Sequence, residues 1–295
     1  MRYMPDEPSG RLLPVHDTQL FVVERGPVNG FPLIVLHGGP GLDHTEFGDY
    51  LDPWTDRYRL VLVDQRAQGR SDRDSDPASW TLPQMASDVS AVAAALGAER
   101  YAVHGHSFGA MVALQHAADA PGAAVATVVS GGVPATRYFD GVDQELATFQ
   151  PEHLRVQVAA SWEREASVAT EAEFAQLLHD QMPFHFGDPE DPRIADYERR
   201  TAGGRLAPAI LRATSLEGGG LSIEVEDALP RVTQPLLACT GRLDRVCPVP
   251  ASERIAELAP HAELHIFERS GHMTFVEEPE EYLRVVGDFL DRATG

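Results

Sequence analysis

Short apolar runs separated by longer mixed segments make up the first 133 residues of the chain. These runs lie at residues 32–36, 59–63, 101–103 and 124–129. Apolar runs bounded by turn residues are typical of strands that are covered on both faces. The mixed stretch at 80–96 has apolar residues at helical spacing, so it predicts a helix, with Thr81 as its N-cap. Residues 11–24 predict two short strands, a hairpin that leads into the sheet.

The same alternation returns near the end of the chain. Apolar runs at 235–240 and 262–267 predict two more strands, and the segment at 251–258 between them predicts a helix. The stretch at 277–291 places Tyr282, Val285, Val286 and Leu290 on one face, which predicts a closing amphipathic helix. Strands that alternate with helices in this way predict an α/β fold, with a mostly parallel central sheet and helices on both faces.

Between these two parts, residues 134–229 contain no strongly apolar strand. Helical segments are predicted at 141–149, 151–166 and 171–182, and they are interrupted at 183–186 and by the acidic loop 187–192. A helical block between two sheet strands predicts a cap inserted over one edge of the sheet. The expected organisation is therefore a core in two parts, 1–133 and 230–295, with a helical cap at 134–229. The three glycines at 218–220 predict a mobile return from the cap.

Composition excludes several classes of partner. The chain has 295 residues, 43% hydrophobic and 23% charged, as in a globular protein, with a formal net charge of −21. Such a charge argues against nucleic acid or an anionic membrane as a partner. The two cysteines are too few for a disulfide framework and lack metal-ligand spacing. The first ten residues show no apolar stretch for a signal peptide or anchor, so cytoplasm is the expected location.

The strongest candidate for chemistry is Ser107, in the five-residue motif GHSFG at 105–109. An apolar strand precedes this motif and a helical pattern follows it. Strand, tight turn and helix around a serine are typical of a nucleophile elbow. The turn holds the serine backbone in a strained conformation that leaves no room for a side chain at 105 or 109. The serine hydroxyl is then presented at the edge of the sheet, near the positive end of the helix dipole.

Two further residues complete a candidate catalytic triad. Asp244 and His272 follow the strands predicted at 235–240 and 262–267, so Ser107, Asp244 and His272 are expected at the same edge of the sheet. A serine hydroxyl becomes a nucleophile when an imidazole accepts its proton, and a carboxylate orients that imidazole. Asp64 is the rival for the acid because it also ends a strand.

Other histidines lie near these positions. His104 and His106 flank the nucleophile but cannot easily reach its hydroxyl, and they are expected to line the pocket or fill space. His37 precedes a glycine-rich turn, HGGPG at 37–41, and is expected to be hydrogen-bonded there. Such a turn at the end of a central strand exposes backbone N–H groups to a developing oxyanion.

In these motifs the chain resembles the α/β-hydrolase superfamily, and within it the proline iminopeptidase family of serine peptidases. The matching motifs are HGGPG, the DQR-x-x-G-x-S run at 64–71, the elbow, the segment 241–244 and Gly271-His272. The resemblance implies an oxyanion hole formed by the N–H groups of Phe108 and Gly39, with Gly38 as the alternative to Gly39. It also implies cap acids that bind a substrate's free amine, and Trp162-Glu163 resembles a Trp-Glu pair of that family. Glu163 is then the candidate amine anchor.

The chain also departs from the proline iminopeptidase pattern. Ala67 follows Asp-Gln-Arg where those peptidases usually have glycine, and His106 and Phe108 flank Ser107 where they usually lack the histidine and carry tryptophan. No second cap acid precedes the aromatic stretch at 184–186, so it would have to come from Asp188 or Glu190. The motif GHSFG is also at home in esterases, lactonases and carbon–carbon bond hydrolases of this fold.

The sequence therefore predicts a serine hydrolase that works through an acyl-enzyme and needs no metal or organic cofactor. The favoured activity is that of a proline iminopeptidase-like aminopeptidase or amino-acid amidase on a small molecule or short peptide, with Glu163, Gly38, His106 and Trp162 as substrate-binding residues. The alternative is a carboxylesterase or lactonase with the same triad. A more remote one is a non-hydrolytic oxygenase, lyase or ligand receptor on the same scaffold.

Overall fold

The computed structural model describes residues 10–215 and 222–295. Over these residues eight strands form a single sheet in the order β1-β2-β4-β3-β5-β6-β7-β8. The strands are β1 (Arg11–Val15), β2 (Thr18–Arg25), β3 (Phe31–Leu36), β4 (Tyr58–Val63), β5 (Ala102–His106), β6 (Ala126–Ser130), β7 (Leu236–Gly241) and β8 (Ala262–Phe267). The hairpin β1–β2 and the pair β2–β4 are antiparallel, and the other pairs are parallel.

The apolar runs form the interior of this sheet because helices cover both of its faces. Strands β5, β6 and β7 are buried along their whole length, whereas β8 at the edge is partly exposed. In the parallel register Leu36, Gly105, Val129 and Ala238 are neighbours across four strands. The carboxyl ends of these strands therefore meet at one edge of the sheet, and the loops that follow them are brought together there.

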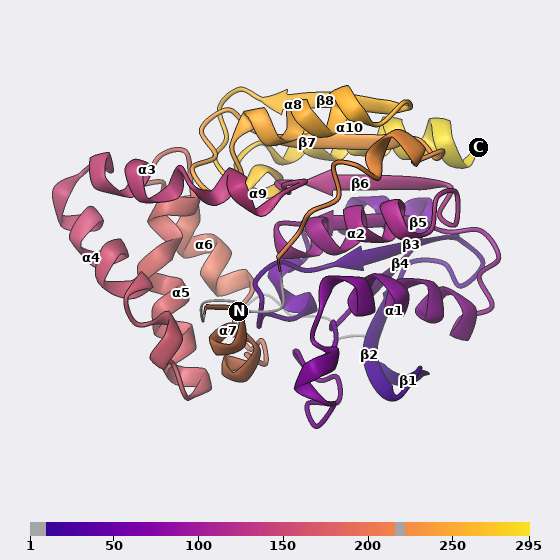
Figure 1. Ribbon diagram of the computed structural model, residues 1–295, viewed down its shortest axis with the longest axis horizontal. Helices are drawn as coiled ribbons and strands as arrows, with labels where there is room; N and C mark the ends of the chain where they lie inside the picture. The colour runs from indigo at the N-terminus through magenta and orange to yellow at the C-terminus, as the bar shows by residue number, and fades with distance from the viewer. Residues whose placement is uncertain (1–9, 216–221) are drawn as a thin grey trace.

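Two buried clusters, one on each face, hold the helices to the sheet (Figure 1). On one face lie α1 (Leu82–Ala95), α2 (Phe108–Asp119) and α8 (Val249–Leu258). On the other lies α10 (Pro279–Thr294), which follows the short α9 (Thr274–Glu277). Thr81 caps α1 as expected, since its hydroxyl accepts a hydrogen bond from the N–H of Gln84 at 3.3 Å. The predicted α/β class, with helices on both faces of a mostly parallel sheet, is confirmed.

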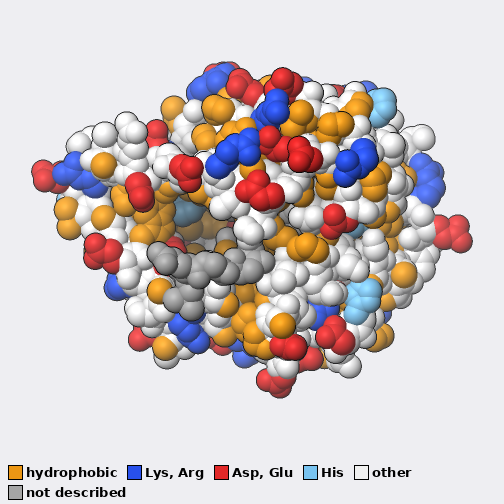
Figure 2. All heavy atoms as spheres, viewed as in Figure 1, with side chains coloured by type: hydrophobic (Ala, Val, Ile, Leu, Met, Phe, Trp, Pro, Cys, Tyr) orange, Lys and Arg blue, Asp and Glu red, His pale blue; other side chains and the backbone are white. Residues whose placement is uncertain are grey.

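Five helices of the segment between β6 and β7 lie together at one end of the sheet (Figure 1). They are α3 (Val142–Thr148), α4 (Glu152–Trp162), α5 (Glu171–His185), α6 (Arg193–Arg200) and α7 (Pro208–Ser215). We call them the helical insertion; the boundaries at 134 and 229 stay a prediction. Figure 2 shows that the surface is hollowed where the insertion meets the sheet, with a histidine side chain visible inside.

Helix α5 differs from its prediction because it continues through Pro183 to His185. The break expected at 183–186 is therefore wrong at its first residues. Phe184 is fully buried and packs edge-on against Phe149 and Trp162, at 5.1 and 4.8 Å between ring centroids. Burial of an aromatic ring of this size contributes enough free energy to offset the hydrogen bond that a proline removes from a helix.

Short 3₁₀ helices fill several of the connections. They are η1 (His44–Phe47), η2 (Asp52–Asp56), η3 (Pro77–Ser79), η4 (Thr136–Phe139), η5 (Glu165–Ser167) and η6 (Leu229–Arg231). No helix in residues 10–215 or 222–295 is both long enough and apolar enough to cross a membrane.

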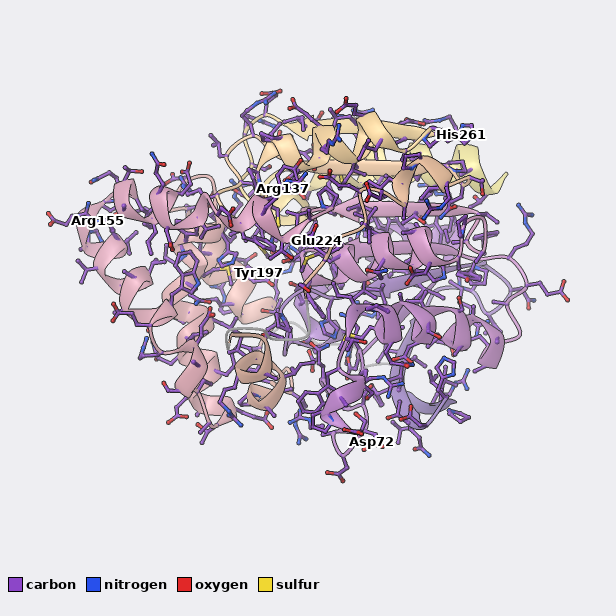
Figure 3. All side chains as sticks on the ribbon, viewed as in Figure 1. Asp72, Arg137, Arg155, Tyr197, Glu224 and His261 are labelled. Carbon is purple, nitrogen blue, oxygen red and sulfur yellow. The ribbon has the colours of Figure 1, made fainter. Side chains whose placement is uncertain are left out.

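The two ends of the helical insertion lie side by side. Ala135 forms an antiparallel bridge with Glu224, and the N–H of Thr136 donates to the carbonyl of Ile223 at 2.9 Å. Figure 3 labels Arg137 and Glu224 close to this crossing. The glycines predicted to form a mobile return lie outside the described residues.

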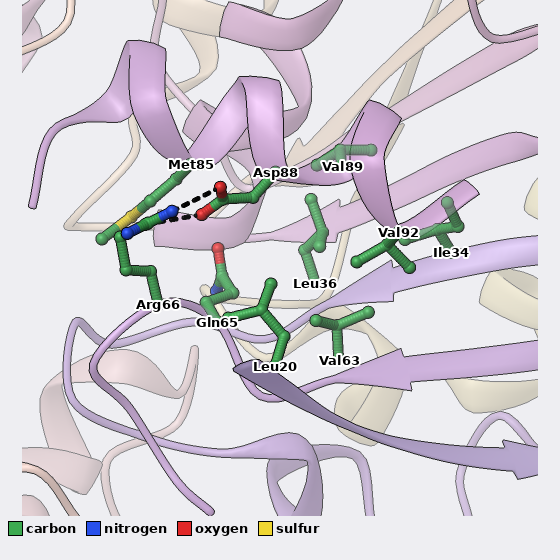
Figure 4. Close-up of a pocket in the computed structure, with 10 residues that line it drawn as sticks. All are labelled: Leu20, Ile34, Leu36, Val63, Gln65, Arg66, Met85, Asp88, Val89 and Val92. Carbon is green, nitrogen blue, oxygen red and sulfur yellow. Dashed lines mark hydrogen bonds and ion pairs between the residues drawn. The ribbon is translucent and has the colours of Figure 1, made fainter. Parts of the chain in front are cut away.

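A buried ion pair joins the loop after β4 to helix α1 (Figure 4). The Arg66 side chain is fully buried, and its Nε and Nη2 donate to the two carboxylate oxygens of Asp88, each at 2.8 Å. Its Nη1 donates to Asp17 at 2.9 Å. The void beside this pair has a volume of about 10 Å³, which is room for about one water molecule, so it is not a ligand site.

Replacing Arg66 should destabilise the protein strongly because Asp88 would stay buried without a partner. We expect Arg66→Met to lower the free energy of unfolding by about 3–5 kcal/mol, measured by urea denaturation. The double variant Arg66→Met/Asp88→Leu should recover much of this loss, since it removes both charges. A single variant that costs less than about 1 kcal/mol would contradict this assignment.

Candidate active site

Ser107 lies in the turn between β5 and α2, with a backbone conformation of φ 54° and ψ −119°. The backbone around it is packed too closely for side chains. A β-carbon at Gly105 would lie 2.1 Å from the carbonyl oxygen of Gly109, and one at Gly109 would lie 2.2 Å from that of Leu36. The two glycines are therefore required for α2 to begin directly against β3. The serine side chain is left at the carboxyl edge of the sheet.

Two loops of the same edge bring Asp244 and His272 together. Oδ2 of Asp244 lies 2.8 Å from Nδ1 of His272, and both side chains are buried. Oδ1 of Asp244 accepts from the N–H groups of Val246 and Cys247, at 2.9 and 2.8 Å. The hydroxyl of Thr240 donates to Oδ2 at 2.9 Å. The carboxylate is thus fixed by four partners, and it holds the imidazole ring in one orientation.

The two members of this pair shift each other's pKa. Burial by itself would raise the pKa of Asp244, but the charge and hydrogen bond of His272 and two backbone N–H groups bring it below its ordinary value. Burial would likewise lower the pKa of His272, but the Asp244 carboxylate raises it above its ordinary value of 6.5. Asp244 is therefore ionised when His272 exchanges a proton.

The helical insertion holds the loop that carries His272. The N–H of His272 donates to the carbonyl of His185, at the end of α5, at 2.7 Å. Glu277 in α9 joins the same two segments, because its carboxylate accepts from the N–H of Gly187 at 2.7 Å and from that of Gly271 at 2.8 Å. The position of the imidazole thus depends on the contact between insertion and core.

Asp64, the rival acid, serves a different histidine. Its Oδ1 lies 2.6 Å from Nδ1 of His44, and its Oδ2 accepts from the N–H of Arg70 at 2.7 Å. Asp43, His44 and Asp64 form a buried group whose spacing could suit a metal ion. The carboxylates of Asp43 and Asp64 already accept backbone N–H donors, however, so the group serves as a hydrogen-bonded support for the loop.

The other histidines occupy distinct places. Nδ1 of His37 donates to the carbonyl of Gly38 at 2.8 Å and its Nε2 accepts from the N–H of Gln65 at 3.2 Å, as expected of a structural residue. His104 contacts the hydroxyl of Tyr282 at 2.6 Å, in the core. His106 lines the same cavity as Ser107, and its ring centroid lies 4.9 Å from that of His272. Burial keeps the pKa of His106 well below 6.5, so its ring is neutral.

The glycine-rich turn distinguishes between the two candidate oxyanion donors. The N–H of Gly38 is engaged, because it donates to Oε2 of Glu46 at 2.5 Å. Gly39 lines the cavity, and its N–H has no acceptor among the described residues. Phe108 is the first residue of α2, where an N–H has no acceptor within the helix. Gly39 and Phe108 are therefore the available donors beside Ser107.

A cavity of about 320 Å³ lies between the helical insertion and the core, and Ser107 and His272 line it. The core also contributes Gly39, Pro40, Leu42, Glu46, His106, Val246 and Met273. The insertion contributes Trp162, Glu165, Phe174, Leu177, Leu178, Gln181, Met182, His185, Tyr197, Leu211 and Thr214. The cavity is thus mainly apolar, with two carboxyl groups, Glu46 and Glu165, in its wall.

The expected amine anchor, Glu163, requires correction. It is exposed at the end of α4 and does not line the cavity, although its neighbour Trp162 does. Successive residues of a helix point about 100° apart, so the two side chains leave α4 in different directions. Asp188 and Glu190, considered as a second acid, are also exposed outside the cavity. Glu165 lines it and accepts from Nε2 of Gln181 at 2.7 Å.

Sequence reasoning missed both carboxyl groups of the cavity. Glu165 lies two residues beyond the Trp-Glu pair, in a short 3₁₀ helix that no periodicity marks. Glu46 lies in η1 after the HGGPG turn, in a segment without motif or repeat. A signal was nevertheless present for Glu46, since an acid among the apolar residues of a loop beside a candidate oxyanion site is unusual.

The close packing at the elbow can be tested without measuring activity. Gly105→Ala should lower the free energy of unfolding by about 3 kcal/mol, because its β-carbon would lie 2.1 Å from a backbone oxygen that cannot move freely. Thermal and urea denaturation measure the change. Gly141→Ala is the matched control, since an added β-carbon there has no atom within 4 Å. Equal stability of the two variants would contradict the packing described for the turn.

Comparison with known proteins agrees with this architecture. The model of a family described as "alpha/beta hydrolase fold" matches residues 32–279. A proline iminopeptidase of Xanthomonas citri is 31% identical over 93% of this chain and 91% of its own length. The structure of a proline iminopeptidase of Mycobacterium smegmatis is similar with a TM-score of 0.75 and 25% identity, over 97% of this chain and 98% of that one.

An esterase from Exiguobacterium antarcticum has the same fold, with a TM-score of 0.74 at 22% identity, over 96% of this chain and all of that one (100%). The relatives therefore include both peptidases and esterases. The predicted resemblance is confirmed. The chain belongs to the alpha/beta hydrolase fold family, and within it the chain resembles proline iminopeptidases.

Proposed function

We propose that this protein is a serine hydrolase that releases an amino-terminal residue, proline favoured, from a small amide or short peptide through an acyl-enzyme. The observation that carries the proposal is that Ser107 and the buried His272–Asp244 pair meet in one cavity with two carboxyl groups. The triad provides the hydrolytic chemistry. The carboxyl groups, together with the resemblance to proline iminopeptidases, support a substrate with a free amine.

In this mechanism the neutral imidazole of His272 accepts the Ser107 proton as Oγ forms a bond to the substrate carbonyl carbon. The negative charge on the carbonyl oxygen is stabilised by the N–H groups of Gly39 and Phe108. When the intermediate collapses, the bond to the leaving group breaks and His272 returns the proton to the departing nitrogen or oxygen. Water then attacks the acyl-enzyme by the same route, and the free acid is released.

The walls of the cavity fit a compact apolar group that carries a charge. Phe174, Leu177 and Leu211 form one apolar part of the wall, where a proline ring would lose its contact with water. Neither Arg nor Lys lines the cavity. Since a carboxylate in an apolar wall is stabilised by a cation, the cavity favours an ammonium group over a negatively charged one.

A carboxylesterase or lactonase is the second candidate function. The apolar wall would accept an uncharged acyl group, and the esterase from Exiguobacterium antarcticum has the same fold. The same triad would hydrolyse either bond, so the presence of the amine on the substrate is what distinguishes the two candidates.

A paired rate measurement distinguishes them. We expect the purified protein to hydrolyse a chromogenic proline amide, and N-acetylation of that amide to reduce kcat/KM at least about 100-fold, on the order of 3 kcal/mol of transition-state binding. Ser107→Ala should remove at least about four orders of magnitude of the activity. Rapid cleavage of a short acyl ester with neither amide cleaved would favour the esterase instead. Full activity of Ser107→Ala would contradict the acyl-enzyme mechanism.

The pH profile tests the His272–Asp244 pair. Because only the neutral imidazole accepts a proton, kcat/KM for an uncharged ester should fall as pH falls through the pKa of His272, which lies above 6.5. Asp244→Asn should move this limb to lower pH, since the carboxylate that raises the pKa is lost, and should reduce the rate about 10³–10⁴-fold. A limb that does not move in Asp244→Asn would show that another group titrates.

A further inference from the structure

Glu46 is a buried carboxyl group that the mechanism above does not use. It lies in η1, directly beside the nucleophile. A β-carbon built on Gly38 would lie 2.6 Å from Oε1 of Glu46 and 3.1 Å from Cβ of Ser107, so the carboxyl group and the serine are on two sides of the same glycine. The N–H of Gly38 fixes the other oxygen, Oε2, at 2.5 Å. The orientation of the carboxyl group is therefore set by the backbone of the glycine-rich turn.

One oxygen of this buried carboxyl group lacks a partner. Among the described residues no donor lies within hydrogen-bond distance of Oε1, and only 7% of Glu46 is exposed. Burial, with a contribution from Asp43, raises the pKa of Glu46 to about 7, and the N–H of Gly38 and His272 act in the opposite direction. Tyr197 from α6 and Tyr282 from α10 are the other titratable groups that respond to its charge.

Glu46 also lies where two cavities meet. The catalytic cavity and a neighbouring cavity of about 450 Å³ share Leu42, Glu46, Leu178, Met182 and Tyr197 in their walls. The wall of the second cavity contains no Arg, and its one histidine, His179, is paired with Glu198 at 2.7 Å. Since Arg is the only permanently charged cationic side chain in this chain, neither wall supplies a permanent cation to Glu46.

We propose that Glu46 is the specificity-determining residue of this site and binds the cationic α-amine of the substrate. This inference rests on the proposed function and assigns the amine to a core residue instead of an acid of the helical insertion. The other carboxyl group of the cavity, Glu165, is already bound to Gln181. Because Glu46 and Ser107 both adjoin Gly38, the amine lies about one residue from the carbonyl that Ser107 attacks. The site therefore selects an amine on the carbon next to that carbonyl.

The test compares two variants on two substrates. The substrates are a chromogenic proline amide and its N-acetylated form, and the variants are Glu46→Gln and the matched control Glu163→Gln, which is exposed outside the cavity. We expect Glu46→Gln to reduce the ratio of kcat/KM for the free amine to kcat/KM for the acetylated substrate at least about tenfold, on the order of 1.4 kcal/mol. Glu163→Gln should keep the ratio of the unmodified protein.

Three outcomes overturn the inference, and they differ in meaning. If Glu46→Gln keeps the ratio, or loses both activities to the same extent, Glu46 supports the Gly38 turn and does not bind the amine. If the unmodified protein shows no preference for the free amine while Ser107-dependent ester hydrolysis persists, the amine specificity of the proposed function fails as well.

A measurement on the unmodified protein covers the case in which Glu46→Gln does not fold. The same ratio is followed between about pH 5.5 and 7.5, where the α-amine of the substrate stays protonated. Because His272 acts on both substrates, its titration cancels in the ratio. We expect the ratio to fall as pH falls and Glu46 becomes neutral. A ratio that is constant over this range would overturn the inference.

Discussion

The close approach of three backbone segments at Gly105 and Gly109 is the constraint on which the site depends. The turn after β5 is so tight that α2 begins against the carbonyl of Leu36 at the end of β3. This contact places Ser107 beside the glycine-rich turn that follows β3, so the nucleophile and the Gly39 donor are set by one packing interaction. The parallel register then brings the loops after β7 and β8 to the same edge, with Asp244 and His272.

The helical insertion is part of this arrangement and not only a cover over it. Two backbone N–H groups of the His272 loop are bound by groups that also contact the end of α5: Gly271 by Glu277, and His272 by the carbonyl of His185. Arg245 crosses the same boundary, because it donates to the carbonyl of Phe186 at 2.6 Å. A displacement of the end of α5 would thus move the imidazole. Substrate fit and base position are mechanically connected.

The sheet could be predicted from the sequence because each interior strand is an apolar run whose burial on both faces leaves one choice of structure. The positions of Ser107, Asp244 and His272 followed from their places at strand ends. The cavity wall could not be predicted in the same way. Glu163 and Glu165 differ by two residues, and only the end of α4 and the turn into η5 decide which side chain reaches the cavity. Helix α6 was missed because its sequence, RIADYERR, has few apolar residues to show a helical period.

The position of Glu46 has a consequence for catalysis through its field at His272. The carboxylate of Glu46 contributes to raising the pKa of His272, which reduces the fraction of neutral imidazole at a given pH. An ammonium bound at Glu46 offsets that negative charge, so the pKa of His272 falls and more of the base becomes available. A substrate with a free amine would then be favoured twice, once by its binding and once by the state of the base. An acetylated substrate obtains neither effect, because it leaves Glu46 unpaired beside the imidazole.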